Sequence, residues 1–212
     1  MAANAIKRRH LIQNLLWPVV VVVIALGWKY PLLGFTVPVV MLAGLIGGVF
    51  KGRWVCGHVC PRGGLFDRVI ARFSPARPIP AILRSPRLRW TVFAALMGFM
   101  AVQISKNPTS LEHLGFVFWL MCAVTTALGL VLAFVYHPRT WCAFCPMGTM
   151  QYALSPKGLG PSLDRAACRN CRKCEQVCPM QLKILERPGA DEPDCLSCGE
   201  CVAGCPVKAL KL

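Results

Sequence analysis

Acidic residues are scarce in this 212-residue chain, which holds 9 Asp and Glu against 24 Lys and Arg. Charged side chains make up only 16% of the residues, well below the roughly 25% of a typical soluble domain. The formal net charge of +15 is of the kind that nucleic-acid-binding proteins carry. However, residues 1–155 hold 15 of the basic residues and 2 of the acids, so the excess is better explained by membrane topology and anionic lipid. Nucleic acid is therefore not an expected partner.

Histidine is equally sparse. The four histidines are His10, His58, His113 and His137, and all lie at the ends of apolar stretches or in loops. A b-type haem inside a helical bundle needs histidines that face each other within the spans, so haem is not expected. His58 lies within a cysteine motif; the simplest interpretation is a solvated interfacial residue, and the alternatives are a metal ligand, a quinone hydrogen-bond partner or a proton acceptor.

Long apolar stretches are abundant, and hydrophobic residues make up 55% of the chain. Four stretches are candidates for membrane spans: residues 11–28, 32–50, about 90–105, and 114–136. A helix needs roughly 20 residues to cross about 30 Å of hydrocarbon, so the third stretch is short and must borrow Leu88 or tilt little. The sequence therefore predicts an α-helical membrane protein with four transmembrane helices.

The distribution of basic residues predicts the orientation of these spans. Residues 51–89 carry nine Lys and Arg against the single acid Asp67, whereas the two loops on the opposite side hold only Lys29 and Lys106. The positive-inside rule places the basic loop in the cytoplasm, and with it both termini. The first apolar run lacks the small-residue exit of a signal peptide and is interpreted as an uncleaved span. A bacterial-type inner membrane is the expected location.

Cysteine is the abundant exception, with 13 residues. Eight of them form two copies of the pattern C-x2-C-x2-C-x3-C-P, which is the two-cluster ferredoxin arrangement. They are Cys168, Cys171, Cys174 and Cys178 before Pro179, and Cys195, Cys198, Cys201 and Cys205 before Pro206. The x2 gaps let three successive thiolates wrap three irons of one cubane, while the fourth cysteine of each copy binds the other cluster.

The two predicted [4Fe–4S] clusters therefore share ligands between the copies. Cluster one takes Cys168, Cys171, Cys174 and Cys205, and cluster two takes Cys195, Cys198, Cys201 and Cys178. Structural zinc or disulfides would also use eight cysteines. Neither predicts a repeat of 27 residues, from Cys168 to Cys195, with a proline after each fourth cysteine. The chain thus divides into a membrane domain, residues 1–155, and a ferredoxin-like α+β domain, residues 156–212.

A second repeat follows the second and fourth spans. Residues 53–63 and 139–148 both contain an arginine, a tryptophan, a cysteine, a short gap, Cys-Pro and a glycine. Each unit contains two spans, so both cysteine pairs emerge at the same membrane face. Pseudo-twofold packing of the two hairpins would bring Cys56, Cys60, Cys142 and Cys145 together as one four-thiolate site.

Several interpretations of these four cysteines compete. Disulfides do not suit a reducing compartment, and zinc would be redox-silent beside two clusters. Inert buried thiols are a common core feature, and a thiol-exchange pair matches the spacing of Cys142 and Cys145 but not that of Cys56 and Cys60. A third iron–sulfur centre is the favoured interpretation. Cys122 lies within a span without a partner, and core packing explains it best.

Beyond each Cys-Pro pair a helix is expected. Leu65, Phe66, Val69, Ile70 and Phe73 follow helical spacing, and Asp67, Arg68 and Arg72 fall on the other side. This pattern describes an amphipathic helix, either in the membrane interface or packed on the membrane domain.

Four spans, a Cys-Pro motif after the second and another after the fourth, and a terminal two-cluster ferredoxin resemble the NapH/MauN-type membrane ferredoxins, related in parts to the NosR and CcoG groups. The resemblance covers nearly the whole chain, although the two-residue gap between Cys142 and Cys145 departs from the commoner three-residue form. It implies membrane electron transfer, with the quinone pool and an iron–sulfur or cytochrome subunit as partners. The alternative is an accessory, maturation or regulatory role for a respiratory metalloenzyme.

Overall fold

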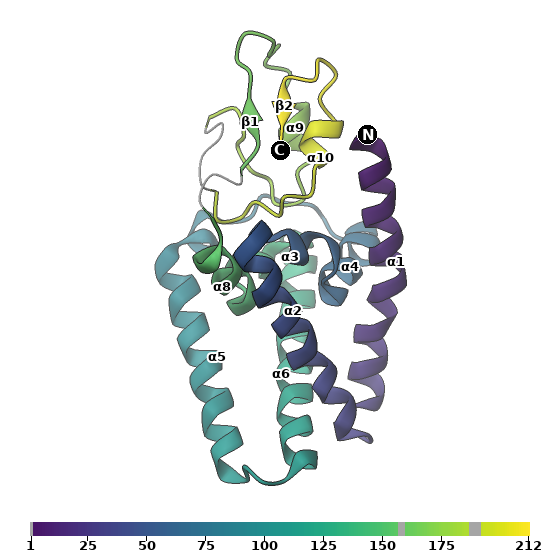
Figure 1. Ribbon diagram of the computed structural model, residues 1–212, viewed down its shortest axis with the longest axis vertical. Helices are drawn as coiled ribbons and strands as arrows, with labels where there is room; N and C mark the ends of the chain where they lie inside the picture. The colour runs from purple at the N-terminus through teal and green to yellow at the C-terminus, as the bar shows by residue number, and fades with distance from the viewer. Residues whose placement is uncertain (1, 157–159, 187–191) are drawn as a thin grey trace.

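The computed structural model describes residues 2–156, 160–186 and 192–212. Four long helices form a bundle, and a small loop-rich part that carries the ferredoxin motifs lies against one end of it (Figure 1). The long helices are α1 (Ala2–Leu26), α2 (Thr36–Lys51), α5 (Pro86–Lys106) and α6 (Leu111–Val135). Each is long and apolar enough to cross a membrane when the 3₁₀ turn η1 (Pro31–Phe35) is counted with α2. The four predicted spans are thus confirmed as helices of spanning length.

The third span is longer than its apolar stretch indicates. Helix α5 begins at Pro86, and the side chain of Ser85 caps it by accepting the Leu88 N–H at 3.3 Å. Serine is a favoured N-cap and proline a favoured first helical residue, so the helix starts before the apolar residues do. The span therefore includes the basic residues Arg87 and Arg89 in its first turn.

Two pairs of short helices follow the second and fourth long helices. They are α3 (Trp54–His58) and α4 (Pro61–Arg68), then α7 (Thr140–Phe144) and α8 (Pro146–Leu154). Cys60 and Cys145 occupy the N-cap positions of α4 and α8 with extended backbone, and a proline follows each. Because proline lacks only an N–H that a first turn does not use, both predicted helix starts at Cys-Pro are confirmed.

The two repeats pack across each other. Helix α8 lies on α2, where a Cβ on Gly48 would lie 3.1 Å from the Gln151 Cα. Helix α4 lies on α6, where a Cβ on Gly129 would lie 2.7 Å from the Phe66 ring. Each short helix is therefore seated against a glycine of the other repeat. Two 3₁₀ turns, η2 (Ile70–Arg72) and η3 (Ala81–Arg84), continue the chain from α4 toward α5.

The ferredoxin part contains little regular structure. It has the short helices α9 (Lys173–Gln176) and α10 (Glu200–Ala203) and one antiparallel pair of strands, β1 (Ser162–Leu163) and β2 (Leu210–Lys211). Within the described residues this pair is the whole sheet content of the chain, so the described strands are too few to establish the expected α+β class. The domain boundary at residues 155 and 156 lies between α8 and β1 and stays a prediction.

The two cysteine motifs nevertheless have the same backbone conformation at matching positions. Positive φ angles occur at Asn170 and Ser197, at Arg172 and Gly199, and at Gln181 and Lys208. The members of each pair are 27 residues apart, which is the spacing of the cysteine repeat. Left-handed residues are uncommon outside glycine, so three matched pairs show that the two loops fold alike.

A continuous core joins the ferredoxin part to the bundle. Residues from α4, α7 and the ferredoxin loops contribute to one buried hydrophobic cluster, which includes Phe66, Trp141, Phe144, Met180, Leu182, Ile184 and Leu196. The contact is close, because a Cβ on Gly57 in α3 would lie 2.6 Å from the Leu196 carbonyl oxygen. The position of the ferredoxin loops relative to α3 is therefore fixed by packing.

Candidate iron–sulfur centres

Four cysteines of the ferredoxin part line one small cavity. They are Cys178, Cys195, Cys198 and Cys201, which are the predicted ligands of cluster two. Burial, and after it the neighbouring thiols, raises the pKa of Cys201 to about 12. The thiol of Cys178 lies near enough to those of Cys195 and Cys198 to feel their charge. The structure thus brings the fourth cysteine of the first motif to the first three of the second.

The other predicted ligand set comprises Cys168, Cys171, Cys174 and Cys205. Burial raises the pKa of the Cys174 thiol, with smaller contributions from Glu175 and from the nearby thiol of Cys205. Cys205 therefore joins the first motif, as the shared-ligand arrangement predicts. Cys171 is the exposed member of this set, and Cys168 is half-buried.

Backbone N–H groups of the ferredoxin loops donate to cysteine sulfurs. Asn170 N–H donates to the Cys168 Sγ at 3.5 Å, and Ala209 N–H donates to the Cys205 Sγ at 3.3 Å. Peptide N–H groups aimed at cysteine sulfur stabilise the negative charge of an iron–sulfur cluster. Among residues 2–156, 160–186 and 192–212, no three His, Cys, Asp or Glu side chains are grouped so as to hold a metal ion. The donor set nevertheless fits two cubanes, because a cubane takes its thiolates at separate corners.

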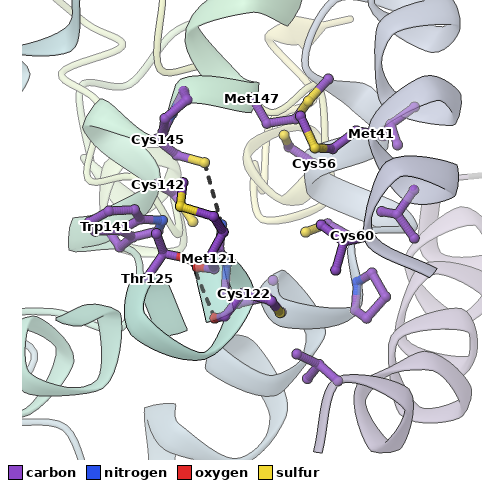
Figure 2. Close-up of a pocket in the computed structure, with 18 of the residues that line it drawn as sticks. Met41, Cys56, Cys60, Met121, Cys122, Thr125, Trp141, Cys142, Cys145 and Met147 are labelled. Carbon is purple, nitrogen blue, oxygen red and sulfur yellow. Dashed lines mark hydrogen bonds between the residues drawn. The ribbon is translucent and has the colours of Figure 1, made fainter. Parts of the chain in front are cut away.

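A larger cavity of about 180 Å³ lies between the long helices at the end of the bundle that carries the ferredoxin part. Five cysteines line it: Cys56, Cys60, Cys122, Cys142 and Cys145. Figure 2 shows Cys56 and Cys60 on one side of it, with Cys142 and Cys145 on the other. The structure thus brings the four membrane-face cysteines together around one space. Cys122, which the sequence assigns to core packing, lines the same space from α6.

Two arginines tie the repeats together reciprocally. Arg53, in the first repeat, donates from Nη2 to the Cys142 carbonyl oxygen at 2.5 Å, and Arg139, in the second, donates from Nη1 to the Cys56 carbonyl oxygen at 3.3 Å. Each guanidinium also fills the space beside a glycine of the opposite repeat: a Cβ on Gly148 would lie 2.5 Å from Arg53, and one on Gly63 would lie 2.8 Å from Arg139. This crossed pair is the clearest sign of the pseudo-twofold packing.

Arginine N–H groups also reach the cysteine sulfurs of the second repeat. Arg139 Nη1 lies 3.6 Å from the Cys142 Sγ, and Arg62 Nη2 lies 3.5 Å from the Cys145 Sγ. Arg62 donates further to the Thr125 hydroxyl at 2.7 Å, and its guanidinium lies over the Trp141 ring, 5.6 Å from the centroid. Arg62 pairs with no carboxylate among the described residues. Its charge therefore faces the cavity.

Asp67 accepts hydrogen bonds from arginines in and behind the cavity wall. It accepts two hydrogen bonds from Arg139, at 2.7 and 2.6 Å, one from Arg9 at 2.7 Å, and one from Gln13 at 2.9 Å. Burial opposes ionisation, but the charges and hydrogen bonds of Arg139 and Arg9 keep the pKa of Asp67 below its usual value. The sequence places Asp67 on the polar face of α4, so its burial corrects that expectation. The lone acid in a strongly basic loop was the signal that could have identified it.

Asp194, in the ferredoxin part, likewise pairs with several arginines of the membrane domain. It accepts hydrogen bonds from Arg53 at 3.2 Å and from Arg89 at 2.7 Å, and Arg84 lies 3.7 Å away. Arg53 also donates to the Pro193 carbonyl oxygen at 2.7 Å. Because Asp194 precedes the cluster ligand Cys195, one arginine connects the membrane-face motif directly to the cluster two loop.

Arg53, Arg62 and Arg139 line the cavity, and no carboxylate among the described residues does; buried arginines also outnumber carboxylates in the layer behind the wall. Arg9, Arg53, Arg89 and Arg139 are all at most 5% exposed. Their carboxylate partners are Asp67, Asp194 and, for Arg9 alone, the half-buried Glu200. With Arg62 added, the cations outnumber the carboxylates, and a buried charge is costly unless it is compensated. An anionic group in the cavity would supply the compensation.

Unpaired polar atoms point to the same conclusion. Among the described residues, Arg53 Nε, Trp141 Nε1 and Gln151 Oε1 are buried without a hydrogen-bond partner, and all three residues line the cavity. A buried donor without an acceptor costs about 1–3 kcal/mol. The two N–H donors suit cluster sulfur, which accepts hydrogen bonds. Four thiolates outweigh the positive charge of an iron–sulfide core, so a cysteine-bound cluster would be an anion of the kind that could compensate these arginines.

Burial affects the acidity of the cysteine thiols in the cavity wall. Burial raises the pKa of Cys56 to about 12, although Arg53 opposes the rise, and burial also raises the pKa of Cys142. A bound metal displaces the thiol proton and replaces it as the counter-charge.

His58 lies outside the lining of this cavity. Its ring stacks on Trp54 with centroids 4.2 Å apart, and its Nδ1 lies 3.0 Å from the Trp54 carbonyl oxygen. Burial, with the charges of Arg9, Lys51 and Arg139, lowers the pKa of His58 to about 4 against the effect of that hydrogen bond. His58 is therefore neutral at pH 7.

Two family models of iron–sulfur proteins match segments of the chain. Residues 33–80 and 115–158 match the family model of a 4Fe-4S binding domain, and these two segments contain the four membrane-face cysteines. Residues 167–210 match that of a 4Fe-4S dicluster domain. The chain carries two 4Fe-4S binding domains. Together with its four helices of spanning length, they fit a membrane ferredoxin.

Two archaeal relatives share part of this chain. Uncharacterized protein MJ0749 of Methanocaldococcus jannaschii is 28% identical over 141 residues, which cover 64% of this chain and 55% of the relative. Uncharacterized protein MJ0750 of the same organism is 25% identical over 148 residues, covering 64% of this chain and 62% of the relative. The chain thus spans less than two thirds of either relative. No solved structure matches it.

Proposed function

We propose that this protein is a membrane-bound iron–sulfur electron carrier that exchanges electrons between the quinone pool and a redox partner. The observation that carries the proposal is the cavity in which Cys56, Cys60, Cys142 and Cys145 face one another from two repeats. These cysteines would hold a third iron–sulfur centre beside the two ferredoxin clusters. The clusters would supply one-electron redox chemistry, and the protein supplies ligands, spacing and electrostatics.

The arginines would tune the third centre. Arg62 and Arg139 contact the sulfurs of Cys145 and Cys142, and the free N–H donors of Arg53 and Trp141 line the same space. Positive charge and hydrogen bonds to sulfur stabilise the reduced, more negative state of a cluster, so they raise its potential. A raised potential would suit a centre that accepts electrons from a quinol.

The contacts support an order for the three centres. Arg53 bridges the Cys142 carbonyl and the cluster two loop, and Gly57 packs on Leu196 between Cys195 and Cys198. The cluster two cysteines therefore lie next to the membrane-face motif, and the cluster one cysteines lie beyond them. Electrons would pass between the membrane site, cluster two, cluster one and a partner in that order or its reverse.

The cavity also suits a quinone. Its remaining walls are apolar side chains from all four long helices, including Val20, Val40, Leu96 and Phe118. The unpaired Gln151 carbonyl oxygen is an acceptor, and a cluster sulfur carries no proton to offer it. A quinol hydroxyl does, so Gln151 would orient the quinol with its ring toward the cysteines.

The proposed location follows from charge. The basic loop between α2 and α5 would face the cytoplasm, which puts the ferredoxin part there as well. Lipid surrounds the spans, and the partner is an iron–sulfur or cytochrome subunit. This topology suits thiolate ligands, which need a reducing compartment.

The proposal is tested by adding a menaquinol analogue to the purified, cluster-loaded protein and following the iron–sulfur EPR signals. We expect reduction in the wild type, slower reduction in Gln151→Leu, and no quinol-driven reduction in Cys142→Ser. Dithionite should still reduce the ferredoxin clusters of both variants, which shows that those clusters are intact. Wild-type clusters that dithionite reduces and quinol does not would overturn the quinone assignment.

A second candidate is an accessory role in assembling a respiratory metalloenzyme. Five methionines also line the cavity: Met41, Met97, Met100, Met121 and Met147. Thioether and thiolate are soft ligands that select soft metals, although methionine also serves simply as core filling. Deletion of the gene separates the cases. An accessory factor leaves its target enzyme metal-poor, whereas an electron donor leaves it assembled but without electrons.

A further inference from the structure

Two acids of the ferredoxin part, Asp194 and Glu200, contact the bundle. Asp194 accepts from Arg53 and Arg89, and Glu200 in α10 pairs with Arg9 at 2.5 Å and lies 3.2 Å from His10. These contacts use its carboxylates to hold the two parts together.

Six basic residues lie in the two segments that carry the predicted cluster one ligands, and we call them the outer basic face: Arg165, Arg169, Arg172, Lys173, Lys208 and Lys211. All six are exposed, and none makes an ion pair with another described residue. The exposed acid in the same segment is Asp164, which accepts from the Ala166 N–H at 3.0 Å. The other acid of these segments is the half-buried Glu175, which accepts from the Leu185 N–H at 3.1 Å. Six cations against these two acids give the outer basic face a net positive charge.

The outer basic face surrounds the ligands of cluster one. Arg169 follows Cys168 and Arg172 follows Cys171 in the sequence. The Lys208 N–H donates to the Cys205 carbonyl oxygen at 3.3 Å. Cys171 is the exposed cysteine among the eight ferredoxin ligands. Cluster one would thus lie close to solvent beneath a ring of positive charge.

Lipid does not account for this face. The strand pair and the loops next to it lie at the end of the molecule farthest from the spans (Figure 1). The attraction of a membrane surface falls off within a Debye length, about 8 Å at physiological ionic strength. Basic residues near the bundle serve topology, but those on the outer face need a different partner.

We propose that the outer basic face is the docking surface for a soluble redox protein whose own redox centre is surrounded by acidic residues. Docking brings the partner's centre to the exposed side of cluster one. One electron then crosses between cluster one and the partner, one centre being oxidised as the other is reduced, and no atoms are transferred. Complementary charge steers such encounters and raises their rate by about 10 to 10³ at low salt. This inference rests on the proposed function and names the class of partner.

Two protein probes of opposite charge test the proposal. Oxidised flavodoxin serves as an acidic acceptor and oxidised cytochrome c as a basic acceptor. The full protein is reduced in detergent, freed of reductant, and mixed with each probe at increasing salt. We expect the flavodoxin rate to fall steeply with salt and the cytochrome c rate to rise or stay flat.

Charge reversal then locates the effect. In Arg169→Glu/Arg172→Glu we expect the flavodoxin rate at low salt to fall at least about 10-fold and the cytochrome c rate to rise. The control is Arg72→Glu/Arg87→Glu, which makes the same charge change at exposed residues on the bundle side and should leave both rates unchanged. A change in cluster potential would move both probes in the same direction, so opposite movement identifies docking.

The outcomes separate this inference from the proposed function. Salt-independent flavodoxin rates, or equal losses in the outer-face and control variants, overturn the docking surface. A failure of quinol to reduce the wild-type clusters overturns the quinone assignment, yet it leaves the probe measurements valid because they start from chemically reduced protein. The docking surface can therefore be lost or retained independently of the quinone site.

Discussion

Replacing Asp67 with asparagine tests the arginine cluster behind the cavity. The substitution keeps the size of the side chain but removes the charge that accepts two hydrogen bonds from Arg139 and one from Arg9. Both arginines are at most 3% exposed, so they would be left buried and short of a counter-charge. Breaking a buried ion pair from one side costs about 3–5 kcal/mol.

The expected loss is large enough to measure in detergent. For a chain of this size each kcal/mol moves the melting temperature by about 2–4 °C, so Asp67→Asn should lower it by about 6–20 °C. Thermal unfolding of cluster-loaded protein, followed by circular dichroism, measures the shift. Asp67→Glu, which retains the charge, should recover part of it.

The control is Glu186→Gln, which breaks the exposed pair between Glu186 and Lys183 at 3.1 Å. Surface pairs contribute about 0–1 kcal/mol, so its melting temperature should change by less than about 4 °C. If Asp67→Asn melted within about 2 °C of the wild type at unchanged iron content, the ion pairs of Asp67 would not stabilise the membrane-face site, and the reasoning would fail.

Three further predictions follow from other contacts. Burial and the charges of Arg139 and Arg84 lower the pKa of His137 from 6.5 to about 4, although Asp67 opposes the shift. The folded state therefore favours the neutral ring, and its full stability is present above about pH 6.5. As the pH falls from 6.5 toward 4, the unfolded chain takes up a proton that the folded chain does not, so this stability is lost. His137→Asn should therefore flatten the decline of melting temperature between pH 6.5 and 5, and an identical decline would refute this. Gly129→Leu and Gly48→Leu should each lower thermal stability by about 1–3 kcal/mol because of the close contacts with Phe66 and Gln151, whereas Gly98→Leu, with open space around it, should not; equal effects at all three would contradict the crossed packing. Arg53→Lys should slow quinol-driven but not dithionite-driven reduction of the ferredoxin clusters, since lysine cannot reach Cys142, Pro193 and Asp194 together; stopped-flow absorbance distinguishes the two, and unchanged quinol kinetics would argue against the bridge.

Local patterns in the sequence predicted much of this arrangement. The spans follow from apolar length, and the helix starts at Pro61 and Pro146 follow from the preference of proline for a first turn. The approach of Cys178 to the second ferredoxin motif and of Cys205 to the first agrees with the spacing of the repeat, while the ligand sets themselves stay a prediction. These features depend on near neighbours or on a repeat, so one sequence contains the necessary signal.

The rest depends on contacts between distant segments. Asp67 lies on the polar side of a helical pattern. The packing of α1 on α4 brings Arg9 to it, and the crossed packing of the repeats brings Arg139. The Arg53 bridge to Asp194 joins residues 141 positions apart. Cys122 gave no motif, because its place in the cavity is set by the approach of α6 to the short helices. Periodicity shows which face of a helix is apolar but not which distant charge meets its polar face.

Iron and acid-labile sulfide, counted per polypeptide on anaerobically purified protein, test the central claim most directly. Two ferredoxin clusters and a third cubane in the membrane-face cavity require about twelve irons, and Cys56→Ser/Cys142→Ser should retain about eight. A wild type with about eight irons, unchanged by that double substitution, would contradict the third centre and with it the account of the cavity.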